Sequence, residues 1–148
     1  KSEISILIKT YLPYAGGFQV YTFEELLSKD KKLLKLKPLK AKALLHGHCH
    51  QKAFGDMSSV EQLLRQIPDL DLDIINSSCC GMAGAFGYEA EHYETSIKMA
   101  ELDLLPAVRD ADRDCLIVAD GTSCRHQISD GSHRKALHVA QVLDMVLE

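Results

Sequence analysis

Three short apolar runs along the chain predict β-strands at residues 42–46, 70–75 and 115–119. In the second run leucine and isoleucine alternate with aspartate, whereas the third run is uninterrupted and ends at an Asp-Gly pair. Period-two alternation and short β-favouring runs are both typical of strands. A further strand is expected at residues 4–8.

Segments with apolar residues spaced by three and four positions separate these strands and predict helices. A capping-box pattern opens the first helix, over residues 58–67, and Pro68 ends it. A long amphipathic helix is expected over residues 88–105, with a break at Pro106, and a largely buried last helix over residues 134–147. This alternation predicts an α/β domain with a small, mainly parallel sheet of three to four strands flanked by helices.

Composition and charge limit the class of protein. Of the 148 residues, 46% are apolar and 26% charged, which suits one globular domain over residues 1–148, with residues 1–41 as a leading segment. The net charge of −4 disfavours nucleic acid as a partner, and no apolar run is long enough to span a membrane. Because the sequence starts without methionine and without a secretory or transit signal, we expect a C-terminal fragment of a longer protein.

Most of the cysteines lie in the loops that follow the predicted strands. Cys49 follows the first strand and Cys124 the third, while Cys79 and Cys80 follow the second. Ligands of open α/β sheets bind outside the carboxyl ends of the strands, so these four cysteines are expected to converge on one site. Cys115 lies within the third strand and is expected to behave as a small hydrophobe. An odd number of cysteines without a secretory signal favours a reduced, cytoplasmic setting.

Histidines and glycines surround the same loops. His46, His48 and His50 alternate around the first cysteine, and a site role is expected for at least one of them as a ligand or a neighbouring polar group. His48 and His50 are expected beside the bound group. Gly81 and Gly84 follow the cysteine pair just before a predicted helix, where glycine permits close backbone approach to an anionic cofactor.

Cysteine spacing alone leaves the metal open. The paired Cys-x-x-Cys knuckles typical of zinc are absent from the sequence, and so is the C-x2-C-x2-C run of cubane ferredoxins. The remaining interpretation is a site whose cysteines are distant in the sequence and are brought together by the fold. Such a site can bind an iron–sulfur cluster or, through mixed cysteine and histidine ligands, zinc.

Three motifs resemble one known family. Residues 48–51 read His-Cys-His-Gln, residues 79–89 read Cys-Cys-Gly-Met-Ala-Gly-Ala-Phe-Gly-Tyr-Glu, and residues 119–125 read Ala-Asp-Gly-Thr-Ser-Cys-Arg. They resemble the cysteine-rich CCG domain of heterodisulfide reductase B subunits and of the iron–sulfur subunits of glycolate oxidase and anaerobic glycerol-3-phosphate dehydrogenase. The likeness is closest to the C-terminal region of bacterial fusion proteins in which an FAD-linked 2-hydroxyacid dehydrogenase precedes cysteine-rich domains.

The resemblance implies that Cys49, Cys79, Cys80 and Cys124 hold an iron–sulfur cluster of the 4Fe–4S type. The spacing agrees with the family pattern, because 29 residues separate Cys49 from Cys79. The family pattern ends in Cys-x-x-Cys, but Gln127 stands at the position of its last cysteine. The ligand set is therefore one cysteine short of that pattern.

The resemblance further implies an electron-transfer domain that does not turn over alone. Its partner would be the flavin domain of the same parent chain, where FAD oxidises a 2-hydroxy acid such as glycolate, lactate or 2-hydroxyglutarate. Its electrons would pass to a quinone or another carrier. The implied location is the cytoplasm, or the inner-membrane surface through the parent complex. The alternative is a zinc-binding or metal-free module for subunit interaction.

Overall fold

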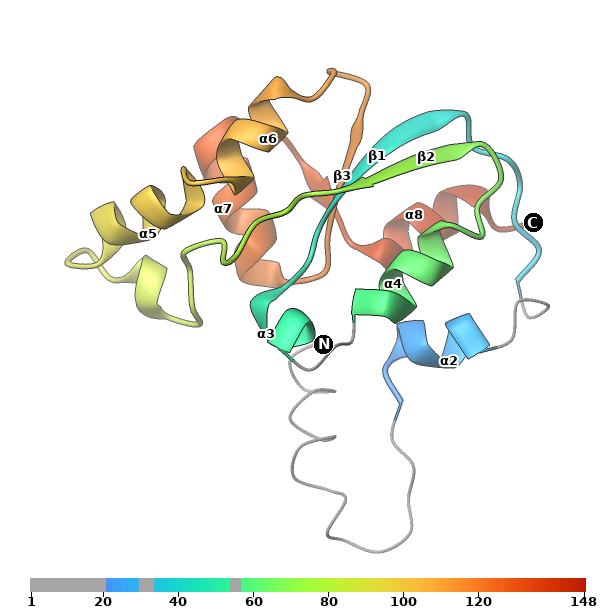
Figure 1. Cartoon of the computed structure of the whole chain (residues 1–148), viewed down its shortest axis with the longest axis horizontal. Coiled ribbons are helices and arrows are strands. Elements are labelled where there is room, and N and C mark those ends of the chain that lie inside the picture. The colour runs from blue at the N-terminus through green and yellow to red at the C-terminus, as the bar shows by residue number, and fades with distance from the viewer. Residues whose placement is uncertain (1–20, 30–33, 54–56) are drawn as a thin grey trace, which may run out of the picture.

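The computed structural model describes residues 21–29, 34–53 and 57–148, so the strand expected at residues 4–8 lies outside the described part of the chain. Figure 1 shows a central sheet with helices on both sides. In chain order the elements are α2 (Phe23–Lys29), β1 (Ala41–His46), α3 (Cys49–Ala53), α4 (Met57–Leu64), β2 (Leu70–Ile74), η1 (Phe86–Tyr88), α5 (Tyr93–Ala100), α6 (Leu104–Asp110), β3 (Leu116–Ala119), α7 (Thr122–Ser132), β4 (Ala136–Leu137) and α8 (Val139–Val146).

The four strands of the described residues form one parallel sheet in the order β2-β1-β3-β4. The predicted α/β class and the three predicted strands are confirmed, with boundaries that differ by one residue or less. The chain passes from β1 to β2 on one side and then to β3 on the other. The direction of winding therefore reverses at β1 and β3.

Side chains on the two faces of the sheet pack against different helices. On one face Leu45 and Val118 join a buried apolar cluster with residues of α4 and α8. On the other face Ile117 and Ala119 join a second cluster with residues of α6 and α7. His46 pairs with Ala119 in the strand register, so its side chain projects to this second face.

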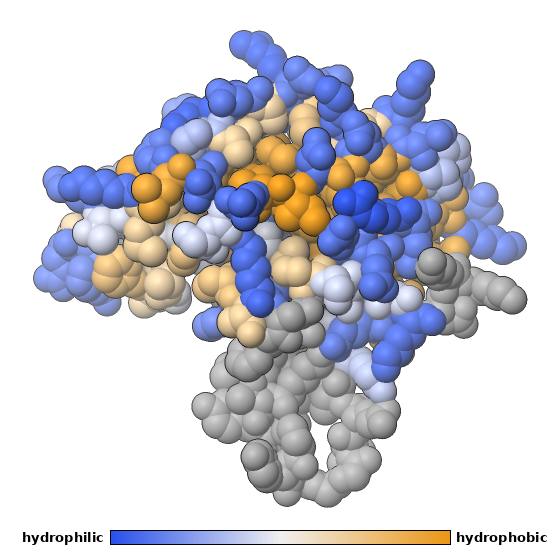
Figure 2. Space-filling view, in the orientation of Figure 1, coloured by the Kyte–Doolittle hydropathy of each residue, from blue (hydrophilic) through white to orange (hydrophobic). Residues whose placement is uncertain are grey.

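β2 is an edge strand with one side open to solvent. Leu72 is buried, whereas Asp71 and Asp73 are exposed and Ile74 is 42% exposed. Figure 2 shows apolar side chains across the middle of the face that carries β1 and β2 in Figure 1, surrounded by charged groups. The alternation in the sequence therefore marks an edge position rather than a strand buried on both faces.

The long helix expected over residues 88–105 is wrong in its continuity. The segment forms η1 and α5, and α6 begins only at Leu104. The predicted break at Pro106 is also wrong, because Pro106 is the third residue of α6. A backbone N–H in the first turn has no acceptor within the helix, so proline fits there without breaking it.

Two differences concern the C-terminal part of the chain. The expectation that Cys124 lies in a loop is wrong, because α7 begins at Thr122 and includes it. The last helix begins at Val139 rather than at the expected residue 134, because a capping box fixes its N-terminus at His138. The His138 ring accepts a hydrogen bond from the Ala140 amide, and the Gln141 side chain accepts one from the His138 amide. The residues before this cap pair with β3 as β4. No helix within the described ranges is long and apolar enough to cross a membrane.

Candidate metal centre

The loops that carry the cysteines leave the sheet along one edge. His46 at the end of β1 pairs with Ala119 at the end of β3, and Leu45 pairs with Ile74 at the end of β2. Because these strands are parallel, the segments that follow them start side by side. The winding reverses at β1 and β3, which is where open α/β sheets bind ligands.

Three buried side chains form the inner part of the site, and we call them the inner trio: His46, Cys80 and Cys124. One ligand atom from each lies within 4.8 Å of the other two. The Cys124 thiol donates a hydrogen bond to Cys80, with 3.3 Å between their Sγ atoms. The trio joins the end of β1, the loop after β2 and the first turn of α7, and each residue is at most 3% exposed. Thiolate and imidazole donors of this kind suit a transition metal.

Ser77 orients the imidazole of His46. The Ser77 Oγ atom lies 2.8 Å from His46 Nδ1. The other ring nitrogen, Nε2, is buried and has no hydrogen-bond partner among the described residues. Metal-binding histidines commonly place one nitrogen on the metal and the other in such a hydrogen bond. The buried Nε2 atom of His46 is thus available to bind a metal, and the residues of the site fit such a group.

Cys49 and Cys79 lie on the outer side of the inner trio, and we call them the outer pair. Both are half-buried, and Cys49 is the first residue of α3. Burial raises the pKa of the Cys49 thiol, and the neighbouring sulfurs of Cys79 and Cys80 raise it further. The four cysteines expected at the site therefore lie together, two of them buried and two partly open to solvent.

The buried thiols hold their protons unequally. The hydrogen bond from Cys124 lowers the pKa of Cys80 to about 4, and His46 contributes in the same direction. The same hydrogen bond, together with burial, raises the pKa of Cys124. These opposite shifts favour a Cys80 thiolate that accepts a hydrogen bond from a protonated Cys124 thiol. Binding of a metal by both sulfurs would release that proton.

Gly81 allows two adjacent cysteines to face one site. Its φ angle is +88°, and a Cβ atom there would collide with the carbonyl oxygen of Ser96. The Gly81 amide donates to the sulfur of Cys79 at 3.3 Å, and the Met82 amide donates to Cys80. Hydrogen bonds from backbone amides stabilise charge on sulfur and tune the potential of a bound cluster.

Lys52 fixes the loop that precedes the cysteine pair. Its ammonium group donates to the carbonyl oxygens of Ser77 and Ser78. Burial lowers the pKa of Lys52, and the sulfurs of Cys124 and Cys49 would oppose that shift when ionised. A cation held beside the sulfurs offsets part of their negative charge.

The other predicted site residues divide into buried and exposed positions. His48 is buried, and a Cβ atom at Gly121 would meet both the His48 ring and the Cys124 sulfur, so the backbone approaches the site closely here. His50 is exposed, with its ring edge-on to that of His48. Gly84 is also exposed, with a φ angle of +68° and open space around its Cβ position. Glycine is therefore favoured here by the backbone conformation of the turn, and not by close packing.

Gln127 occupies the position where the sequence analysis noted the absence of a cysteine. The Gln127 side chain is buried, and its Nε2 atom lies 3.2 Å from the Cβ position of Gly81. Cys115 comes just before β3, at the opposite end of that strand from Cys124. It is half-buried rather than part of the strand interior. Its separation from the other cysteines agrees with the sequence analysis.

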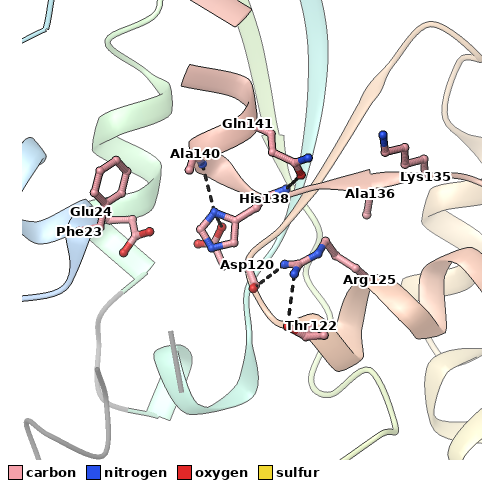
Figure 3. Close-up of a pocket in the computed structure, with 10 residues that line it drawn as sticks. All are labelled: Phe23, Glu24, Asp120, Thr122, Arg125, Lys135, Ala136, His138, Ala140 and Gln141. Carbon is pink, nitrogen blue, oxygen red and sulfur yellow. Dashed lines mark hydrogen bonds and ion pairs between the residues drawn. The ribbon is translucent and has the colours of Figure 1, made fainter. Parts of the chain in front are cut away.

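A cavity of about 740 Å³ lies beside the centre, between α2 and the starts of α7 and α8 (Figure 3). Asp120 is the buried residue that connects the two regions. Its Oδ1 atom accepts from the Val139 amide, and its Oδ2 atom lies 3.5 Å from the amide nitrogen of Gln51. Asp120 therefore ties the helix that begins with Cys49 to the start of α8.

The sequence analysis missed a cluster of two carboxylates and a histidine in this cavity, whose lining also includes Arg125 and Lys135. Glu24, Asp120 and His138 each place one possible ligand atom within 4.8 Å of the others. Burial raises the pKa of Glu24, and the charge of Asp120 acts in the same direction. Asp120 Oδ1 and His138 Nδ1 already accept hydrogen bonds from backbone N–H groups, so these two atoms stabilise the start of α8. No sequence signal marks Glu24, because its burial depends on how α2 packs.

The fold and site together define a cysteine-rich candidate metal centre in a doubly wound α/β domain. The chain is 34% identical over 118 residues to one subunit of the anaerobic glycerol-3-phosphate dehydrogenase of Escherichia coli. It is 32% identical over 101 residues to D-2-hydroxyglutarate dehydrogenase of Pseudomonas putida, and 37% identical over 73 residues to the Escherichia coli protein of the same name. The chain is thus similar to parts of larger dehydrogenases.

The first two matches cover most of the chain, and all three cover little of the relatives. The first covers 80% of the chain and 29% of the glycerol-3-phosphate dehydrogenase subunit, the second 67% and 10%, and the third 49% and 7%. No protein-family profile matches the chain. No solved structure matches it either.

Proposed function

We propose that the chain is an iron–sulfur-binding, electron-transfer domain of the CCG type within a larger FAD-linked dehydrogenase. The observation that carries this proposal is the meeting of four cysteines and a buried histidine at the point where the winding of the sheet reverses. Similarity to parts of two kinds of dehydrogenase supports an oxidoreductase.

The chain's own residues would bind and insulate the cluster. Cys49, Cys79, Cys80 and Cys124 would supply sulfur ligands, and the two buried ones would keep water away. The amides that donate to sulfur, with His48 nearby, would tune the stability of the reduced state. A bound cluster supplies the capacity to take and give one electron at a time.

The proposed parent reaction is oxidation of a 2-hydroxy acid to a 2-oxo acid. This removes two electrons and two protons from the substrate: FAD takes a hydride, and a protein base or water takes the second proton. The electrons then leave singly through this domain to a quinone or another carrier. A flavin domain of the same parent chain is the proposed partner, at the cytoplasmic surface of the inner membrane or in the cytoplasm. Relatives named for 2-hydroxyglutarate favour this substrate class.

The half-buried outer pair is the proposed side for electron exchange. Cys80 and Cys124 are buried, whereas Cys49 and Cys79 are partly open, so a redox partner can approach the cluster most closely there. Electrons would reach and leave the cluster through this side.

The test is anaerobic purification of the full-length protein, followed by iron and acid-labile sulfide analysis and electron paramagnetic resonance (EPR) before and after reduction. We expect iron and sulfide in the wild type and their loss in Cys80→Ser. Mixed cysteine and histidine donors also favour zinc as a second candidate. An X-ray absorption edge scan separates the metals, and zinc without iron or sulfide would contradict the electron-transfer function.

A further inference from the structure

We infer that His46 is itself a ligand of this centre, with Nε2 bound to the metal beside Cys80 and Cys124. The inference rests on the proposed iron–sulfur function and goes beyond the four cysteines. It means that a neutral imidazole on β1 adds a donor to a set that lacks the cysteine at position 127.

The first argument is position. His46 is the last residue of β1, on the sheet face that packs against α7. Its ligand atom lies within 4.8 Å of the sulfurs of both Cys80 and Cys124. Two sulfurs and one nitrogen at this spacing are close enough to belong to one metal centre.

The second argument is the unequal use of the two ring nitrogens. Nδ1 lies 2.8 Å from the Ser77 hydroxyl, whereas Nε2 has no hydrogen-bond partner among the described residues. His46 is only 1% exposed, so water does not readily satisfy Nε2. Leaving a buried polar atom without a partner costs free energy, which a bond to a metal would remove.

The third argument is that the surroundings accommodate the tautomer that a ligand needs. A metal-bound Nε2 carries no proton, so Nδ1 must carry one and donate it to Ser77. Lys52 donates to the Ser77 carbonyl oxygen and lies 3.5 Å from its hydroxyl oxygen. Ser77 is thereby held in place, and it holds the imidazole plane in turn.

The neighbouring candidates are less suited to bind the metal. The Gln127 amide is engaged with Ser96, and His50 is exposed. His46 combines burial, proximity to two sulfurs and a ring nitrogen, Nε2, that makes no hydrogen bond of normal geometry to a described residue. It is therefore the residue that compensates for the missing cysteine.

Ligation by histidine would change the reduction potential of the centre. Exchange of a thiolate for a neutral imidazole removes one negative charge from the cluster environment, and this raises the reduction potential of iron–sulfur centres. We therefore expect His46→Cys to retain iron and to lower the midpoint potential of the site. His133→Cys, at an exposed position at the end of α7, is the matched control and should leave the potential unchanged.

The deciding measurement is pulsed EPR of the reduced full-length protein with ¹⁵N-labelled histidine. We expect a strong hyperfine coupling from a directly bound nitrogen in the wild type and in His133→Cys, and its loss in His46→Cys. The wild-type spectrum alone tests the inference if a variant fails to fold.

Other results would overturn the inference in different ways. Iron and sulfide with no strong histidine coupling would leave the proposed function intact and remove His46 as a ligand. Persistence of the coupling in His46→Cys would assign it to another histidine. Absence of iron and sulfide from the wild type would refute the proposed function, and this inference with it.

Discussion

The side-chain amide of Gln127 donates to two atoms of Ser96, its carbonyl oxygen at 3.2 Å and its hydroxyl oxygen at 3.0 Å. Both residues are buried. Gln127 lies on α7, which carries Cys124, and Ser96 lies on α5, next to Gly81. Gln127 thus joins α7, which carries Cys124, to α5, which packs against the loop that carries Cys80.

This contact predicts that Gln127→Ala destabilises the protein without removing its metal. The Ser96 carbonyl would lose its side-chain donor in a buried setting, at a cost of about 1–3 kcal/mol. Urea denaturation and iron analysis of the same preparations provide the measurement. Gln62→Ala, on the exposed side of α4, is the matched control. Loss of iron from a folded Gln127→Ala protein would show that Gln127 is part of the metal site.

The second prediction contrasts two cysteines. Cys80→Ser should abolish or severely reduce metal binding, because a hydroxyl group cannot replace a thiolate on a soft metal. Cys115→Ser should keep the metal and cost about 1 kcal/mol or less, because Cys115 is half-buried at the far end of β3. Metal analysis of both variants checks this. The reverse result would mean that the metal lies at the end of the sheet where Cys115 is, and it would contradict the proposed site.

Much of this arrangement could be predicted because it depends on local pattern and on one rule of parallel sheets. The strands have short β-favouring runs, and each cysteine of the proposed site follows a strand end. Parallel strands end at a common edge, so convergence of Cys49, Cys80 and Cys124 follows once the strands are known.

The remaining features depend on tertiary contacts. Apolar spacing continues across residues 101–103, so it does not reveal the break between α5 and α6. The first turn of α7 is polar and resembles a loop. The choice among three closely spaced histidines required the strand register, which turns His46 toward the buried cysteines. The burial of Glu24 depends on a contact between distant segments.

The two predicted glycines should respond differently to substitution. Gly81→Ala would place a Cβ atom against the Ser96 carbonyl, whereas Gly84→Ala would meet no atom within 4 Å. Both have positive φ angles, so Gly84→Ala should cost only the conformational penalty, about 1–2 kcal/mol. Gly81→Ala should cost more and reduce the metal content. Equal losses of stability and metal in both variants would argue against close packing at Gly81.

The last prediction concerns the pH dependence of stability at Glu24. Burial, with a contribution from the charge of Asp120, raises the pKa of Glu24 above its ordinary value of 4.5. The folded state therefore binds more protons than the unfolded state between these two values, and the free energy of unfolding falls as pH rises through that window. Below it the carboxyl group is neutral in both states, and above it the full cost of a buried charge is present.

Glu24→Gln keeps the shape and removes the charge, so its stability relative to wild type should increase as pH rises above about 4.5 and then level off. Urea denaturation from pH 4 to pH 8 measures this difference. Glu94→Gln, on the exposed side of α5, controls for the loss of one carboxylate. A constant difference between Glu24→Gln and wild type at every pH would mean that ionisation of Glu24 costs the fold nothing. In that case the carboxyl group would have to be solvated or paired with a cation inside the cavity.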